Sequence, residues 1–258
     1  MLLSAAPSGR HIDGRREKGY DSKGDLLFGK RRVGLQFRLE LQRAASYRRE
    51  DFIVSPSNVG AVRAVDAWPV WHAGALALVG PEGAGKSHLA RAWANRAGAA
   101  VLALSEGEAP DLTEIRGRPV LLEDADRGAP DEVLFHLINM AGVPGGGLLL
   151  TGRTPPSAWP ARLPDLRSRL NALSVAELPA PDDVILEGLL RKFFRERNIK
   201  PTDDLIPYLL RRIERSATRA REVVAKLDEV ADAEQRGVSR ALARQILDND
   251  SDTLDLFD

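Results

Sequence analysis

The stretch GPEGAGKS at residues 80–87 constrains the fold of this chain more than any other part of the sequence. It fits the pattern G-x-x-x-x-G-K-[ST] and lies between an apolar run at 75–80 and a helical pattern at 86–97. In such a loop, glycines let backbone N–H groups turn inward around phosphate oxygens, and the start of the helix adds partial positive charge. The sequence therefore predicts a phosphate-binding loop formed by Gly80, Pro81, Glu82, Gly83, Ala84, Gly85, Lys86 and Ser87.

Four side chains carry the chemistry expected of this loop. The amine of Lys86 can reach the β- and γ-phosphates of a nucleotide, and the hydroxyl of Ser87 can ligate Mg²⁺. Partner carboxylates are expected where a neighbouring strand ends, and Glu123 and Asp124 occupy such a place in the run 118–125. Their order is unusual, because an Asp normally comes first, so we expect nucleotide binding without fast hydrolysis by this chain. A solvated strand end is the alternative interpretation.

The surrounding segments predict an α/β domain with a parallel sheet flanked by helices. Continuous apolar runs are typical of strands that are buried on both faces, and here they alternate with helical patterns. The four runs lie at 75–80, 99–105, 118–125 and 147–152. Thr151 stands at the tip of the last run, where its hydroxyl could contact a γ-phosphate or could simply cap the strand.

Beyond the connector ELPAPDD at 177–183 the sequence predicts only helices. Four apolar stripes at helical spacing indicate a small all-helical domain, and the stiff prolines Pro179 and Pro181 mark its boundary. Helix N-caps are predicted at Asp182 or Asp183, Thr202, Ser216 and Ser239.

Composition narrows the class of protein. The formal net charge is zero, so no overall field draws the chain to nucleic acid, and a DNA-binding role would need a dedicated element. There are no cysteines, which excludes disulfides and thiolate metal sites. No apolar run approaches the roughly 18–20 residues of a membrane helix. We therefore expect a cytoplasmic protein with no membrane partner.

The order of these motifs resembles that of AAA+ ATPases, and three finer matches resemble the DnaA-related family. LLLTGRTPP with LPDLRSRL (163–170) resembles the stretch after the sensor-1 strand, and SATRAREVVAKLDEV (216–230) resembles the sensor-2 helix. FIVSPSN (52–58), which includes Asn58, resembles the segment near the adenine. The resemblance covers roughly residues 35–247. A core and lid with no DNA-reading domain after them is the arrangement of the Hda-type regulatory inactivators of DnaA, so we expect that type and not the initiator.

The resemblance implies roles for particular residues. Arg169 matches an arginine finger that reaches the ATP of a neighbouring subunit, although a solvated helix residue is the plainer alternative. Arg219 matches the sensor-2 arginine, which contacts the nucleotide from the lid, and a salt bridge within the lid is its alternative. The family also implies bound ADP, whereas the loop motif indicates only ADP or ATP with Mg²⁺. The implied partners are DnaA and the sliding clamp of DNA polymerase III (its beta subunit), with a homo-oligomer possible.

Two segments resemble clamp-binding peptides. QFRLEL (36–41) keeps the glutamine and leucines of the pattern Q-L-[SD]-L-P-L, and its binding residues would be Gln36, Phe37, Leu39 and Leu41. The same alternation is typical of an edge strand. TLDLF (253–257) is a rival peptide, with Leu254, Leu256 and Phe257 as its apolar residues. We favour the N-terminal peptide because both its position and its leading Gln match.

The expected organisation has five segments. They are a disordered arm at 1–34, a clamp-binding peptide at 35–42, the nucleotide-binding core at 43–179, the helical lid at 180–248 and an acidic tail at 249–258. The expected function is a clamp-tethered negative regulator of replication initiation that stimulates hydrolysis of DnaA-bound ATP and turns over little ATP itself. The alternatives are an autonomous ATPase that acts as a helicase loader or remodeller, and a nucleic-acid-binding module. No sequence-specific DNA binding is expected.

Overall fold

The computed structural model describes residues 47–102, 112–113 and 115–254, with side chains up to Asp248. The peptide at 35–42 lies outside these residues, as do Leu256 and Phe257. All described residues fall within one compact unit, Ala45–Asp258.

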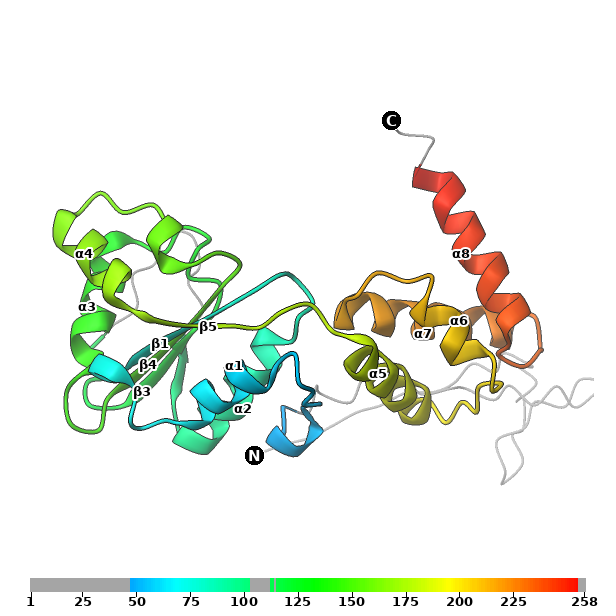
Figure 1. Cartoon of the computed structure of the whole chain (residues 1–258), viewed down its shortest axis with the longest axis horizontal. Coiled ribbons are helices and arrows are strands. Elements are labelled where there is room, and N and C mark those ends of the chain that lie inside the picture. Colours follow the sequence, from blue (N-terminus) through cyan, green and yellow to red (C-terminus); the bar gives the residue numbers. More distant parts are fainter. Residues whose placement is uncertain (1–46, 103–111, 114, 255–258) are drawn as a thin grey trace, which may run out of the picture. The chain divides into compact units, whose positions relative to one another are not determined.

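A five-stranded parallel sheet forms the centre of the first domain (Figure 1). The strand order is β2-β3-β4-β1-β5. The strands are β1 (Ala75–Val79), β2 (Ala100–Leu102), β3 (Pro119–Leu122), β4 (Gly147–Gly152) and β5 (Ser174–Glu177). Every residue of β1 is buried, because β1 pairs with β4 on one side and β5 on the other. The predicted α/β class is therefore confirmed, and the predicted phosphate-binding loop follows a strand that is buried along its whole length.

Helices cover both faces of this sheet. Leu76 and Leu78 of β1 pack with α1 (Val59–Asp66) and α2 (Lys86–Ala97). The alternate residues of β1 pack with α3 (Asp131–Ala141) and α4 (Pro164–Ala172) on the opposite face. This period of two follows from the pleat of a strand, which points successive side chains to opposite faces. Short 3₁₀ helices lie at Arg49–Asp51, His72–Gly74 and Pro156–Ala158.

Two strands differ from expectation. The run at 99–105 was predicted to be buried, but β2 is an edge strand and its Val101 is half exposed. The prediction was wrong because an apolar run does not reveal which strand closes the sheet. β5 was not predicted at all, since its sequence SVAE is short, mixes polar and apolar residues, and buries only Ala176.

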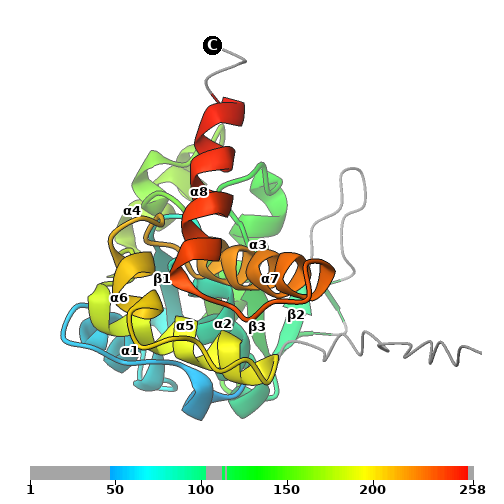
Figure 2. The same cartoon turned by 90° about the vertical axis from the view of Figure 1, so that its right-hand side faces the viewer.

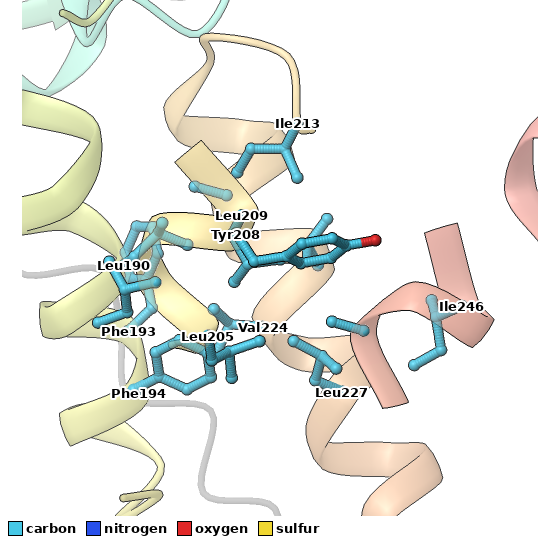
Figure 3. Close-up of a cluster of buried hydrophobic side chains, with 14 of the residues drawn as sticks. Leu190, Phe193, Phe194, Leu205, Tyr208, Leu209, Ile213, Val224, Leu227 and Ile246 are labelled. Atoms are coloured by element: carbon cyan, nitrogen blue, oxygen red, sulfur yellow. The ribbon is translucent and has the colours of Figure 1, made fainter. Parts of the chain in front are cut away.

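Four helices follow the core, as predicted, and Figure 2 shows them coloured from yellow to red. They are α5 (Asp183–Glu196), α6 (Leu205–Leu210), α7 (Ala217–Ala233) and α8 (Arg240–Leu254). Their apolar stripes meet in a separate hydrophobic core, which contains Phe194, Leu209 and Leu227 (Figure 3). The last helix continues to Leu254, into the segment expected as an acidic tail.

The helix starts test the predicted N-caps. The Asp182 carboxylate accepts a hydrogen bond from the backbone N–H of Ile185, and the Ser216 hydroxyl accepts one from Arg219. Both caps are confirmed. The prediction of Thr202 was wrong, because α6 begins after Asp204. Within the described part of the chain, no helix is both long and apolar enough to cross a membrane.

Candidate nucleotide-binding site

The loop 80–85 joins β1 to α2 and has the backbone conformation that its glycines permit. Gly83 and Gly85 have φ angles of 72° and 99°, a region that side chains disfavour. Lys86 is buried, and its ammonium donates to the carbonyl oxygens of Gly80 and Pro81, both at 2.8 Å. The amine predicted to bind phosphate therefore also ties together the first two residues of the loop.

Several charged groups near Lys86 influence the pKa of its ammonium. Burial lowers the pKa of its ammonium, and the negative charges of Asp124 and Asp126 oppose that shift. Arg153 lowers the pKa further, while its guanidinium forms an ion pair with Glu82 of the loop at 2.8 Å. The loop thus lies beside a small group of charges of both signs.

The ends of β3 and β4 meet at this place. The Thr151 hydroxyl is buried and accepts a hydrogen bond from the backbone N–H of Asp124 at 2.9 Å. Asp126 accepts the backbone N–H of Arg153 at 2.7 Å with one carboxylate oxygen, while its other oxygen is buried without a hydrogen-bond partner. Thr151 therefore ties the loop that carries both aspartates to the tip of β4.

Glu123 is placed differently from these aspartates. Its carboxylate forms an ion pair with Arg91 of α2, with both guanidinium contacts at 2.7 Å. Hydrogen bonding to Glu123 is the largest cause of the raised pKa of Arg91. The carboxylate expected to hold Mg²⁺ thus already has a cationic partner.

The lid contacts the phosphate-binding loop directly. The backbone N–H of Ala217, at the start of α7, donates to the carbonyl oxygen of Gly83 at 2.9 Å. A side chain at Gly83 would overlap the Ser216 hydroxyl. Arg219 lies in the first turn of the same helix and pairs loosely with Glu222 at 3.6 Å. The structure therefore places the start of the Arg219 helix against the predicted loop.

A second link between core and lid involves the segment 52–58. The Ser55 hydroxyl donates to the Asp182 carboxylate at 2.6 Å. Asn58 is buried, and its side-chain amide binds the backbone N–H of Ser55 and the backbone carbonyl of Ile53, both at 2.9 Å. Asn58 therefore shapes the turn that carries Ser55.

Arg167 and Arg169 on α4 have different surroundings. The Arg167 guanidinium donates to three backbone carbonyls, those of Ser157, Trp159 and Ala161. The exposed Arg169 guanidinium lies over the Phe135 ring, 5.0 Å from its centroid. Arg167 therefore stabilises its own segment, while Arg169 is accessible from outside the molecule.

These residues fit a nucleotide better than they fit a metal ion. The positive-φ glycines, the buried amine and the helix start form a cradle for phosphate groups. Ser87 and Asp124 could contribute to a Mg²⁺ site, but Glu123 is neutralised by Arg91. Among the described residues, no group of three or more His, Asp or Glu side chains could hold a metal ion.

Solved structures establish the fold. Domain III of DnaA from Thermotoga maritima superimposes with a TM-score of 0.63 at 20% identity, covering 79% of this chain and 96% of that one. The branch migration motor RuvB from the same organism gives 0.61 at 15% identity, covering 79% and 72%. AMPPCP-bound DnaA from Aquifex aeolicus gives 0.54 at 22%, covering 71% and 64%. The fold is that of AAA+ P-loop proteins.

Sequence comparison gives similar relatives. The chain is 25% identical over 228 residues to the initiator DnaA of Thermomicrobium roseum, covering 78% of this chain and 49% of that protein. It is 28% identical over 207 residues to the replication factor C large subunit of Sulfurisphaera tokodaii, covering 71% and 44%. The chain thus spans about half the length of these curated relatives. No family model matches it.

Sequence reasoning missed three residues of this site, namely Arg91, Asp126 and Arg153. Arg91 lies one helical turn after Ser87, which could have placed it on the same face of α2. Asp126 and Arg153 each follow a predicted site residue by two positions, Asp124 and Thr151 respectively. The sequence signals were therefore present but no stronger than those of many surface charges.

Proposed function

We propose that this chain is a nucleotide-binding AAA+ regulator of DNA replication that stimulates hydrolysis of ATP held by a DnaA-type partner. Its own loop, with Lys86 at the phosphates and Arg219 approaching from the lid, would bind ADP or ATP. Ser87 and Asp124 are the remaining candidate ligands of Mg²⁺. The similarity in sequence and fold to replication proteins supports a role in DNA replication.

The observation that carries this proposal is the contrast between Arg169 and Arg167. A finger arginine must present its guanidinium to another molecule, and Arg169 is exposed whereas Arg167 donates to three backbone carbonyls. A guanidinium placed at a γ-phosphate stabilises the charge that develops as the phosphoryl group is transferred. The Phe135 ring supports the guanidinium of Arg169 without neutralising it.

The clamp supplies the tether in this proposal. Gln36, with Phe37, Leu39 and Leu41, would bind a pocket of the sliding clamp through apolar side chains and one amide. Leu254, Leu256 and Phe257 form the alternative peptide. Tethering raises the effective concentration of the regulator near replication complexes.

The test follows hydrolysis of DnaA-bound ATP in the presence of clamp loaded on DNA. Wild type should stimulate hydrolysis, and Arg169→Ala should lose this stimulation. Gln36→Ala should lose the stimulation only under conditions in which hydrolysis depends on the clamp. Arg162→Ala is the matched control, since Arg162 is another exposed arginine next to α4. Full stimulation by Arg169→Ala would refute the finger assignment. If Gln36→Ala still binds the clamp but deletion of residues 253–258 abolishes binding, the clamp-binding peptide is the C-terminal one.

An autonomous ATPase is the second candidate, because Lys86, Asp124 and Thr151 converge at one edge of the sheet. It predicts substantial turnover by the isolated chain, which Lys86→Ala would abolish. A nucleic-acid-binding lid has less support, since Arg212, Arg215 and Arg221 face carboxylates at Asp248, Asp183 and Glu196. It predicts DNA affinity that falls steeply with salt.

A further inference from the structure

Arg91 of α2 is held by two neighbours, Glu123 and Tyr47. Its guanidinium contacts the Glu123 carboxylate at 2.7 Å through two nitrogens, and its other contact is the Tyr47 ring, 5.0 Å from the centroid. Glu123 is only 17% exposed, so water and salt screen this ion pair less than a surface pair. Through these contacts Arg91 connects α2 to the end of β3 and to the segment before α1.

The position of Glu123 gives this ion pair its significance. It occupies the place at the end of β3 where a carboxylate that holds a metal ion is expected, one residue before Asp124. Its charge is paired with that of the Arg91 guanidinium.

We propose that Arg91 is a resident cation that replaces a divalent metal ion at Glu123, so that nucleotide binding by this chain does not depend on a metal ion. The inference rests on the proposed nucleotide binding and concerns its need for a metal ion. Phosphate groups and an unpaired carboxylate repel each other, and a metal ion placed between them commonly removes that repulsion. Arg91 removes it permanently, and it acts as a positioning residue through Glu123 without touching the nucleotide.

The consequence for hydrolysis follows from the same charges. A guanidinium is permanently protonated. Unlike a metal ion, it cannot act as a Lewis acid that binds and activates a water molecule. The ion pair between Glu123 and Arg91 therefore favours nucleotide binding over nucleotide hydrolysis. This accords with a chain that uses its own nucleotide to hold its structure while acting on a partner.

The experiment measures ADP affinity by calorimetry with excess EDTA and again with excess MgCl₂. Wild-type affinity should agree within about threefold between the two conditions. Arg91→Gln should lose roughly tenfold affinity in EDTA, the size expected when a charged hydrogen-bond partner is removed. MgCl₂ should restore that loss. Arg91→Gln combined with Glu123→Gln should regain affinity in EDTA, and Arg91→Lys should resemble wild type because it keeps the charge.

Arg96→Gln is the matched control. Arg96 lies on the same helix, has the same 43% side-chain exposure as Arg91, and pairs with Asp66 at 3.2 Å, away from Glu123. Its affinities in EDTA and MgCl₂ should equal those of wild type. Circular dichroism of each variant verifies folding.

Three results would overturn the inference. Wild-type affinity that falls tenfold or more in EDTA would show that a metal ion is needed despite Arg91, and would leave the nucleotide site standing. Equal behaviour of Arg91→Gln and Arg96→Gln would remove the role of Arg91. A wild type that binds no ADP in either condition would refute the nucleotide site and this inference together. The Arg169 assay is separate, because it measures hydrolysis of the partner's ATP.

Discussion

Lys86 shows at the scale of one residue how the loop prepares for phosphate. A buried ammonium needs hydrogen-bond partners, and here two loop carbonyls provide them. Because those carbonyls are neutral, burial still lowers the pKa of Lys86. A bound phosphate would place further negative charge beside this ammonium and would oppose the lowering of its pKa.

Replacing Lys86 tests this directly. Lys86→Ala should fold but should show no increase in melting temperature with ADP. Wild type should gain about 2.7 kcal/mol of stability when ADP is present at 100 times its Kd. Differential scanning fluorimetry with and without ADP measures both, and Lys226→Ala on α7 is the control. An equal thermal shift in Lys86→Ala and wild type would contradict the loop assignment.

Asp182 provides a prediction about pH. Burial raises its pKa, but hydrogen bonds from Ser55, Ile185, Ser57 and Val184 outweigh that effect and hold the pKa below the ordinary value of 3.8. Because the unfolded chain then binds the proton more readily, the contribution of Asp182 to stability is complete above pH 3.8. It disappears as the pH falls through the lower folded-state pKa.

The comparison of wild type with Asp182→Asn measures this contribution. At pH 7 we expect the variant to lose roughly 1 kcal/mol of unfolding free energy, because Asn can still cap the helix but does not carry the charge that strengthens these hydrogen bonds. The difference should shrink in urea titrations carried out below pH 3.8. Ser55→Ala should show a loss of similar size at pH 7. A difference that stays constant down to pH 2 would contradict the assignment of the lowered pKa.

At the scale of elements, the contact of Gly83 with the start of α7 joins the loop to the lid. Gly83→Ala should lose about 1–3 kcal/mol of unfolding free energy, from left-handed backbone strain and from overlap with Ser216. Gly98→Ala is the matched control, since Gly98 also has a positive φ, of 62°, but has open space around it. Chemical denaturation of both variants separates strain from overlap. Equal losses would show that overlap with Ser216 contributes nothing.

The same scale shows what the sequence could predict. The loop, three of the strands and the four lid helices follow from strong local patterns of glycine and apolar residues. The strand β5 could not be predicted, because it owes its place to pairing with β1 more than to its own residues. The half-exposed β2 was mispredicted because exposure depends on the order of strands in the sheet.

The candidate site divides in the same way. Lys86 and Thr151 are expected from their place in a motif, and the structure brings Thr151 to Asp124. The pairing of Arg91 with Glu123 spans 32 positions along the chain, and no local pattern specifies it. This ion pair could therefore be found only in the folded structure.

At the scale of the whole molecule, two proposed roles fall on different residues. The core and lid meet around the chain's own loop through Gly83 and through the Ser55–Asp182 hydrogen bond. Arg169 lies on α4 with its guanidinium exposed, so it can act on a different molecule. The proposed regulator therefore uses one nucleotide for structure and addresses a second one in trans.

The most direct test is single-turnover hydrolysis of ATP pre-bound to DnaA, with this protein in saturating excess so that tethering is unnecessary. The account predicts that wild type accelerates the hydrolysis step and that Arg169→Ala removes about 10³-fold or more of that acceleration while still binding its own ADP. Arg162→Ala should match wild type. If Arg169→Ala accelerates hydrolysis as well as wild type does, the central claim is contradicted.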